Sequence, residues 1–410
     1  MGATRTGRAA AWAVPMLAEA GALIRSAAMA WAIGPDELGR AMVLALTLRL
    51  AEMISDIGIE RLLAQSAKGD APGFLNALHG AALIRGLAMA LMLLALAVPM
   101  ALALPGGAHA GGYAALAAIP LVRGFLHLEY RRAERDFSYR AMALVEGGAV
   151  LAMLASLPVV LAIRADHSAI IAVLAVQAVA QVALSHLVAR QRYALAFDRD
   201  VLREVFVFGL PLVGNALLMF LTFQADRLIV AGFFGWTEVA IYGVALQLAM
   251  LPAQITGRAA ASLLAPRLRR AMAAGALPAA MQAAMRAHLL LALAFAAGFA
   301  ALAPFVIGLV YGAAFRPETA LALAFGVAAG LRILRTPLSQ CAVITGRTGD
   351  PARANLLRAA ALVPALLVAA WGLPLHALAL AAVCGEGAAT LRAHHLLRHS
   401  LAPFSSECLT

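Results

Sequence analysis

The sequence predicts an all-α, polytopic membrane protein with about 12 transmembrane helices. The chain of 410 residues is 63% hydrophobic and only 13% charged. Apolar runs of 18 residues or more recur along its whole length, and each is long enough to cross a bilayer as a helix. Backbone groups in lipid must be satisfied within the protein, and these runs are too long for barrel strands. Helices are therefore expected throughout.

The expected spans follow one another with short connections. The first is a retained helix rather than a cleaved signal peptide, because Glu19 and Arg25 interrupt its apolar stretch. Arg123 lies inside the fourth span, and only the turn around Gly372 separates the last two. The twelve expected ranges are 11–33, 39–60, 77–104, 113–130, 141–163, 168–188, 205–231, 238–264, 284–310, 319–345, 355–373 and 375–396.

The placement of arginine predicts the orientation. Basic residues gather in alternate connections, and the other connections hold only Arg40, Arg164 and Arg316. By the positive-inside rule the arginine-rich side is cytoplasmic, and both termini lie there. The net charge of +11 then reflects membrane insertion, and no nucleic-acid partner is expected. The basic residues of that side are Arg5, Arg8, Arg61, Lys68, Arg131, Arg132, Arg135, Arg140, Arg190, Arg192, Arg199, Arg203, Arg267, Arg269, Arg270, Arg286, Arg347, Arg353, Arg358 and Arg398.

An internal repeat predicts two bundles of six helices. A shift of 201 residues places Gly34 over Gly235 and Glu37 over Glu238, at the entrance of a helix in each case. An even number of spans in each half makes this a parallel repeat, related by an axis along the membrane normal. Two such bundles with a cavity between them are typical of an alternating-access transporter. The expected parts are an N-terminal bundle over 1–188, a cytoplasmic linker over 189–204, a C-terminal bundle over 205–396 and a cytoplasmic tail over 397–410.

Charged residues within the spans predict a binding cavity. Such groups are costly at bilayer depth and usually face a bundle interior or a wet cavity, although salt bridges between helices are the competing explanation. Arg332 and Arg335 share one helix face. Arginines at central and near-central positions of the spans outnumber the acids, and their forked donors match phosphate oxygens, so an anionic, diphosphate-bearing substrate is expected. The candidate substrate-binding residues are Arg25, Arg49, Arg85, Arg123, Arg332 and Arg335.

Several charged residues are candidates for coupling or gating. Glu52 and Asp56 lie on the same helix face as Arg49. The adjacent pair Asp226-Arg227 follows about 21 residues of the seventh span, which places it near the periplasmic end of a long helix. The pair either fixes the depth and packing of that helix or forms a latch between the bundles. The coupling or gating candidates are Glu19, Glu52, Asp56, Asp226 and Arg227.

No sequence feature indicates catalysis. The chain lacks a phosphate-binding loop with its lysine and lacks a histidine–glutamate metal motif. The cysteines Cys341, Cys384 and Cys408 have no ligand spacing. Membrane glycosyltransferases and polymerases normally need a long loop with catalytic acids, and all loops here are short. We therefore expect no catalytic residue, no cofactor and no metal, and a protein that is not an enzyme.

Two segments resemble a known family. The stretch 208–268 is similar to the seventh and eighth spans of the bacterial polysaccharide-transport family, the Wzx-like oligosaccharide flippase branch of the multidrug/oligosaccharidyl-lipid/polysaccharide exporter superfamily. The stretch 34–65, with Asp56 and Gly58, resembles its second span, and Arg85 falls where members often carry a basic residue. The matching residues of the first stretch are Asp226, Arg227, Gly232, Glu238, Tyr242, Leu251, Pro252 and Pro266.

The resemblance implies a flippase of the bacterial inner membrane. Such a protein moves an undecaprenyl-diphosphate-linked oligosaccharide from the cytoplasmic to the periplasmic leaflet by alternating access. It serves the biosynthesis of a surface polysaccharide (lipopolysaccharide O-antigen, exopolysaccharide or capsule) beside a polymerase and glycosyltransferases.

The alternative is a cation-coupled multidrug or metabolite antiporter, of the same superfamily or of the major facilitator type. In it Glu19 or Asp56 would exchange a proton or sodium ion. The loop between the second and third spans lacks the major facilitator signature, which argues against that type.

Overall fold

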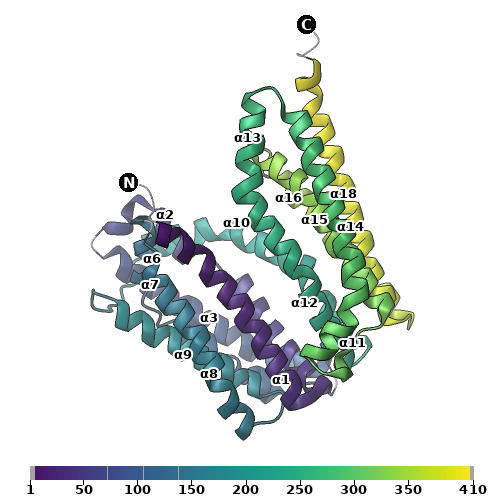
Figure 1. Cartoon of the computed structure of the whole chain (residues 1–410). Coiled ribbons are helices and arrows are strands. Elements are labelled where there is room, and N and C mark those ends of the chain that lie inside the picture. The colour runs from purple at the N-terminus through teal and green to yellow at the C-terminus, as the bar shows by residue number, and fades with distance from the viewer. Residues whose placement is uncertain (1–4, 72, 105, 137, 407–410) are drawn as a thin grey trace. The chain divides into compact units, whose positions relative to one another are not determined.

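Every regular element in the described part of the chain is a helix, as the sequence predicts. The computed structural model describes residues 5–406 except 72, 105 and 137, and side chains over 13–397 with the same gaps. No strand occurs among these residues, so the all-α fold is confirmed (Figure 1). The side chains of Arg5, Arg8 and Arg398 lie outside the described residues, as do positions 407–410 of the expected tail.

The chain forms two compact units, an N-terminal unit Met1–Leu217 and a C-terminal unit Leu218–Thr410. In the N-terminal unit α1 packs against α8 and α9, and α3 packs against α4 and α5. The expected bundle limits at 188 and 205 stay a prediction. The helices of this unit are α1 (Arg5–Ile54), α2 (Ile59–Gln65), α3 (Phe74–Ala103), α4 (Ala110–Ala115), α5 (Ala118–Arg123), α6 (Glu129–Arg132), α7 (Arg140–Met142), α8 (Gly148–Ile163), α9 (Ala169–Val188) and most of α10 (Arg199–Phe223).

The C-terminal unit is built around α15. This helix packs against α12, α14 and α18, and it is the most deeply buried of the apolar helices. Gly326 and Gly330 allow α14 to approach closely, because a Cβ at either position would lie 2.9 Å from a backbone carbonyl oxygen of α14. The helices of this unit are α11 (Asp226–Phe233), α12 (Trp236–Ala259), α13 (Ala265–Ala273), α14 (Leu277–Val310), α15 (Thr319–Ile344), α16 (Asp350–Ala360), α17 (Leu362–Ala370) and α18 (Leu375–Ser406).

Nine helical stretches among the described residues are long and apolar enough to cross a membrane. The first, Ala13–Ile54, covers most of the first and the second expected spans. Four expected spans are not continuous helices. The range 39–60 is broken between α1 and α2, so Asp56 lies in a turn and not on the helix face expected for it, and 355–373 is broken between α16 and α17. The range 113–130 is divided between α4 and α5, followed by a non-helical turn, and 205–231 is interrupted at 224–225, between α10 and α11.

Large apolar side chains cover the outside of these helices. On α14, for example, Leu290 is 69% exposed and Leu309 is 67% exposed. Water would penalise such a continuous apolar surface, whereas lipid would not. The chain is therefore a multi-pass membrane protein.

The two halves share a glycine with positive φ at matching positions. Gly34 breaks α1 with φ 74° and ψ 177°, and Gly235 precedes α12 with φ 128° and ψ 173°. Residues other than glycine are almost never found in this backbone region. The repeat recognised from the sequence thus has a common local conformation.

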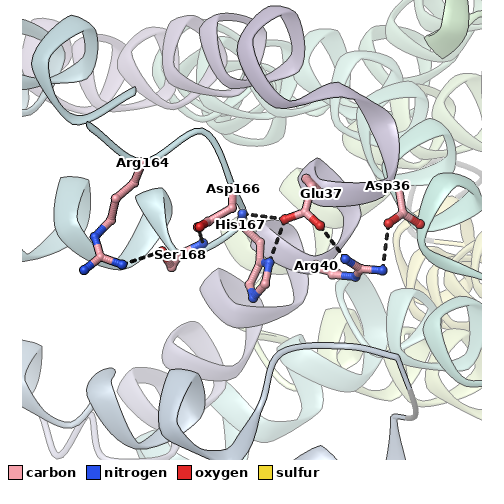
Figure 2. A network of polar contacts seen from close by, with 7 residues as sticks. All are labelled: Asp36, Glu37, Arg40, Arg164, Asp166, His167 and Ser168. Atoms are coloured by element: carbon pink, nitrogen blue, oxygen red, sulfur yellow. Dashed lines mark hydrogen bonds and ion pairs between the residues drawn. The ribbon is translucent and has the colours of Figure 1, made fainter. Parts of the chain in front are cut away.

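Polar contacts fix the break in α1 to the turn between α8 and α9 (Figure 2). Glu37 Oε2 accepts the backbone N–H of His167 at 2.7 Å and lies 2.7 Å from its ring Nδ1. Arg40 pairs with Glu37 and, at 2.8 Å, with Asp36. The turn is itself ordered by Asp166, which accepts the backbone N–H of Ser168 at 2.7 Å. One of the three arginines on the expected periplasmic side, Arg40, is therefore neutralised locally.

The segment between α9 and α10 is also attached to the N-terminal unit. His79 of α3 lies with Nδ1 3.1 Å from the carbonyl oxygen of Ala194. The backbone N–H of Ala196 donates to Asn76 O at 3.0 Å. Lys68 pairs with Glu204 of α10 at 2.8 Å. This connection is held in place by backbone and ionic contacts.

Candidate functional site

The N-terminal unit encloses an open cavity of about 670 Å³ with a charged lining. Its volume lies in the range of small-molecule sites. The wall is formed by the C-terminal part of α1 together with α2, α3, α5 and α6. Its charged lining residues are Arg49, Arg61, Arg85, Arg123, Arg131, Glu52, Asp56, Glu60 and Glu134.

Glu52 is the anionic centre of this cavity. It accepts a hydrogen bond from Arg123 and lies 3.6 Å from Arg49. The expectation that Arg49 and Glu52 meet on one helix face agrees with this contact. Because Glu52 neutralises both arginines in part, an anionic ligand would have to compete with it for them.

Arg85 differs from the other four arginines of this cavity, each of which pairs with a carboxylate. Its Nε donates to Ser55 Oγ at 3.4 Å, and no carboxylate among the described residues lies within ion-pair distance. The guanidinium group has five N–H donors, so most remain available to a ligand. Arg85 is the residue of this cavity best prepared to bind an anion.

Asp56 and Arg131 both line the cavity and hold neighbouring segments in place. Asp56 accepts the backbone N–H of Gly58 at 3.1 Å and lies 3.8 Å from Arg61, so it orders the turn between α1 and α2. Arg131 pairs with Glu60 and Glu134, each at 2.8 Å, and with a third carboxylate, Glu146. Burial lowers the pKa of Arg131, but these carboxylates outweigh it and raise the pKa above its ordinary value.

The C-terminal unit contains a buried charge cluster centred on Glu386. This carboxylate is fully buried and forms ion pairs with Arg358, whose Nε lies 2.6 Å from Oε1, and with Arg335, whose Nη2 lies 3.2 Å from Oε2. Arg358 also donates to the carbonyl oxygen of Thr222, and Arg335 donates to Asn355 at 2.9 Å. One acid thus joins α15, α16 and α18.

Arg332 lies one helical turn from Arg335 but makes different contacts. Its guanidinium carbon is 4.0 Å from the centre of the Phe223 ring. No Asp or Glu of the described chain is within ion-pair distance of Arg332. It lines a second cavity, of about 460 Å³, within the C-terminal unit. The two arginines were expected to share a role, but their surroundings differ. Arg335 forms an ion pair, whereas Arg332 lines the cavity without one.

Asp226 and Arg227 begin α11 rather than ending a long helix. The expected continuous helix over 205–231 is therefore wrong, because α10 stops at Phe223, and the periplasmic position of the pair stays a prediction. Asp226 is buried and accepts from Tyr242 Oη at 2.9 Å and from the N–H of Arg227 at 2.9 Å. Arg227 donates to Gln224 at 2.6 Å. An acid in the first turn also favours the helix dipole.

The predicted residues are thus only partly brought together. The N-terminal cavity collects Arg49, Glu52, Asp56, Arg85 and Arg123, and the C-terminal cavity collects Arg332 and Arg335. The remaining four, Glu19, Arg25, Asp226 and Arg227, line neither. Arg25 makes a 3.4 Å contact with the sulfur of Met153, and Glu19 is half-buried on the same helix.

Sequence reasoning missed Arg131, which lies in a connection that reads as a cytoplasmic loop, and Arg358, which lies at the start of the expected span 355–373 but was grouped with the cytoplasmic basic residues. A signal for Arg358 existed in the apolar stretch that directly follows it. Glu386 lies within the expected span 375–396, where its partners could not be predicted from the sequence. Within the described residues no group of three or more His, Cys, Asp or Glu side chains is arranged to hold a metal ion.

Comparison with known proteins identifies the family of the chain and solved structures with a similar fold. Residues 28–319 match the model of a family described as "Polysaccharide biosynthesis protein". No curated protein sequence matches the chain.

Three solved structures illustrate the likeness in fold. An inward-facing multidrug resistance MATE family transporter of the MOP superfamily is similar with a TM-score of 0.73 and 14% identity, over 94% of this chain and 96% of that chain. Lipid II flippase MurJ in an inward closed conformation has a TM-score of 0.74 and 11% identity, over 96% and 88%. The eukaryotic MATE transporter AtDTX14 has a TM-score of 0.56 and 12% identity, over 93% and 94%. At these identities the likeness concerns the fold alone.

Proposed function

Because the chain belongs to the polysaccharide biosynthesis protein family, we propose that it is a flippase for a lipid-linked oligosaccharide. The substrate is an undecaprenyl-diphosphate-linked oligosaccharide, and it moves from the cytoplasmic to the periplasmic leaflet by alternating access. The family and the flippase and exporter folds that the chain resembles support membrane transport. The chemistry of the cavities supports the diphosphate.

The observation that carries this proposal is the position of Arg85. It lines the N-terminal cavity with a hydroxyl as its protein partner and with donors to spare. A diphosphate offers several charged oxygens to such a group, and forked guanidinium donors match them in geometry. Arg123 and Arg49 would also bind the diphosphate once their ion pairs with Glu52 open. After the substrate leaves, Glu52 would pair with both arginines again.

The proposed activity requires a particular membrane, orientation and set of partners. The protein acts in the bacterial inner membrane with both termini in the cytoplasm, beside a polymerase and glycosyltransferases that make and extend the oligosaccharide. A proton or a sodium ion drives the cycle. The arginine bias of the sequence supports the orientation. The protein moves its substrate without changing a covalent bond, so it is not an enzyme.

The test is the lipid pool of a strain that lacks the gene. We expect undecaprenyl-diphosphate oligosaccharide to accumulate, as measured by mass spectrometry of extracted lipids, and a plasmid with the wild-type gene to clear it. Arg85→Ala and Arg123→Ala should clear it at least about tenfold more slowly, because each removes a charged donor to the diphosphate. Arg164→Ala is the matched control, since Arg164 is exposed and lines neither cavity.

A deletion strain with normal surface polysaccharide and no precursor would contradict the proposal. If that strain instead became sensitive to small cationic compounds, the antiporter function would take its place. Glu19 and Asp56 would then be the residues to replace first.

A further inference from the structure

The cavity of the C-terminal unit differs from the N-terminal cavity in its charge. Three arginines line it, Arg258, Arg332 and Arg335, and its lining includes no aspartate or glutamate. The N-terminal cavity mixes five arginines with four acids. A cavity whose lining contains guanidinium groups and no carboxylate favours an anionic ligand.

Arg332 is the residue in this cavity that is prepared for such a ligand. Its guanidinium carbon lies over the Phe223 ring, 4.0 Å from the ring centre, a cation–π contact that the plane of the group makes best face to face. Its N–H donors lie in that plane and are not used by the stacking. The nearby acid Glu386 is already bound by Arg335 and Arg358. A flat anion such as a carboxylate can therefore take a forked pair of hydrogen bonds from Arg332.

The neutral lining of the cavity points to a sugar. Two hydroxyl groups and three amide groups surround the arginines, and such groups exchange hydrogen bonds readily with sugar hydroxyls. A bare phosphate would leave most of them without a ligand partner. The residues concerned are Gln254, Thr336, Ser339, Gln340 and Asn355. The volume of about 460 Å³ falls within the range for small-molecule sites.

We propose that this cavity is a second substrate subsite, which binds a carboxylate-bearing sugar of the transported oligosaccharide through Arg332. The inference rests on the proposed function and adds a substrate class to it, an acidic glycan. The N-terminal cavity holds the diphosphate, and the C-terminal cavity distinguishes charged from neutral sugars.

The experiment measures binding to the purified full-length protein in lipid nanodiscs. The probes are tri-galacturonic acid, the same trisaccharide with its carboxyl groups reduced to alcohols, and inorganic pyrophosphate. Each is titrated by isothermal calorimetry into the wild-type protein, Arg332→Gln, Arg332→Lys and the matched control Arg85→Gln. Arg85 lines only the N-terminal cavity, so its replacement should leave the sugar probes unaffected.

We expect the wild-type protein to bind the acidic trisaccharide at least about tenfold more tightly than the reduced one, the usual size of a charge-assisted hydrogen-bond pair. Arg332→Gln should lose this preference and keep pyrophosphate binding. Arg85→Gln should keep the preference for the acidic trisaccharide and lose pyrophosphate binding. Arg332→Lys keeps the positive charge but loses the forked pair of donors, so it should retain only part of the preference for the acidic trisaccharide. This variant takes the place of Arg332→Gln if Arg332→Gln does not fold.

Equal binding of the acidic and reduced trisaccharides by the wild-type protein would overturn the inference, and so would a full preference in Arg332→Gln and Arg332→Lys. Competition between pyrophosphate and the acidic trisaccharide for Arg332 would show a general anion site and would also overturn it. These results do not depend on lipid movement. The accumulation experiment can therefore support a flippase even if this subsite is absent. The binding experiment can likewise support the subsite even if no lipid-linked precursor accumulates.

Discussion

At the scale of single residues, Glu386 is the most constrained charge in the C-terminal unit. It is fully buried and compensates two guanidinium groups from two other helices. A buried ion pair contributes little compared with apolar packing, but removing one partner leaves an uncompensated charge at high cost. Here a single change would leave two such charges.

We expect Glu386→Gln to lower the free energy of unfolding by roughly 3–5 kcal/mol. Thermal unfolding of the purified protein in detergent measures this loss. Glu318→Gln is the matched control, because Glu318 pairs with His376 at 3.3 Å on the surface and is 77% exposed. A surface pair of this kind is worth about 0–1 kcal/mol. Equal stability of the two variants would show that the cluster is not a structural centre.

The residue scale also shows how far sequence reasoning reaches. Intramembrane arginines could be recognised because charge in an apolar run is costly, so Arg85 and Arg332 were found. Their partners depend on which helices meet, and helix packing was not predictable from periodicity in so uniformly apolar a chain. Arg335 and Arg332 looked alike for that reason, yet only Arg335 has an acid within reach.

At the scale of elements, the two glycine breaks define where the repeated units bend. Gly34 and Gly235 adopt the same rare backbone conformation, and each has an acid three residues later. Glu37 binds the turn between α8 and α9, whereas Glu238 folds back toward its own helix start, 2.7 Å from where a Gly235 Cβ would lie. The backbone of the repeat is preserved while the use of the acid differs.

Gly34→Ala and Gly235→Ala should each destabilise the protein by about 1–3 kcal/mol, because alanine cannot adopt this conformation without strain. The measurement is the midpoint of unfolding in detergent. Gly298→Ala provides the comparison, since Gly298 lies in the interior of α14 with open space around it. That change should stabilise the helix by about 0.5–1 kcal/mol. A gain in stability for Gly34→Ala would contradict the strain argument.

The break between α10 and α11 could not be predicted from the sequence. The residues around 224–225 contain neither glycine nor proline, so no local signal ended the apolar run. The structure supplies the reason in tertiary contacts, since Tyr242 and the N–H of Arg227 both bind Asp226 and fix the start of α11. Asp226 is thus a helix-start residue, and its role in gating stays a prediction.

At the scale of the whole molecule, the orientation in the membrane is the next property to test. The bias of arginine predicts that α13 ends in the cytoplasm and that the α8–α9 turn faces the periplasm. In a background without the three native cysteines, Arg269→Cys and Arg164→Cys place thiols at exposed positions in these two segments. A membrane-impermeant maleimide added to intact cells should label only the second variant. Labelling of only the first would reverse the topology.

Fold class and repeat were accessible at this scale because they depend on patterns that extend over the whole chain. Long apolar runs allow only helices in lipid, and a matched Gly and Glu mark the two halves. The size and lining of the cavities were not accessible, since they depend on which side chains from different helices converge. Arg131 and its three carboxylates are an example, as they come from α2, from α6 and the segment after it, and from the helical segment that directly precedes α8.

The ion pair of Lys68 with Glu204 has a practical consequence. Lys68 is the only lysine in the sequence, and its side chain is exposed. The contact with Glu204 raises the pKa of the Lys68 amine through a hydrogen bond and charge attraction, which slows its reaction with acylating reagents. An amine-reactive dye therefore labels one lysine side chain besides the α-amino group, and mass spectrometry of peptides separates the two sites. The rate of attachment at Lys68 then reports how readily its ion pair with Glu204, at the start of α10, opens. No engineered residue is needed to follow that motion.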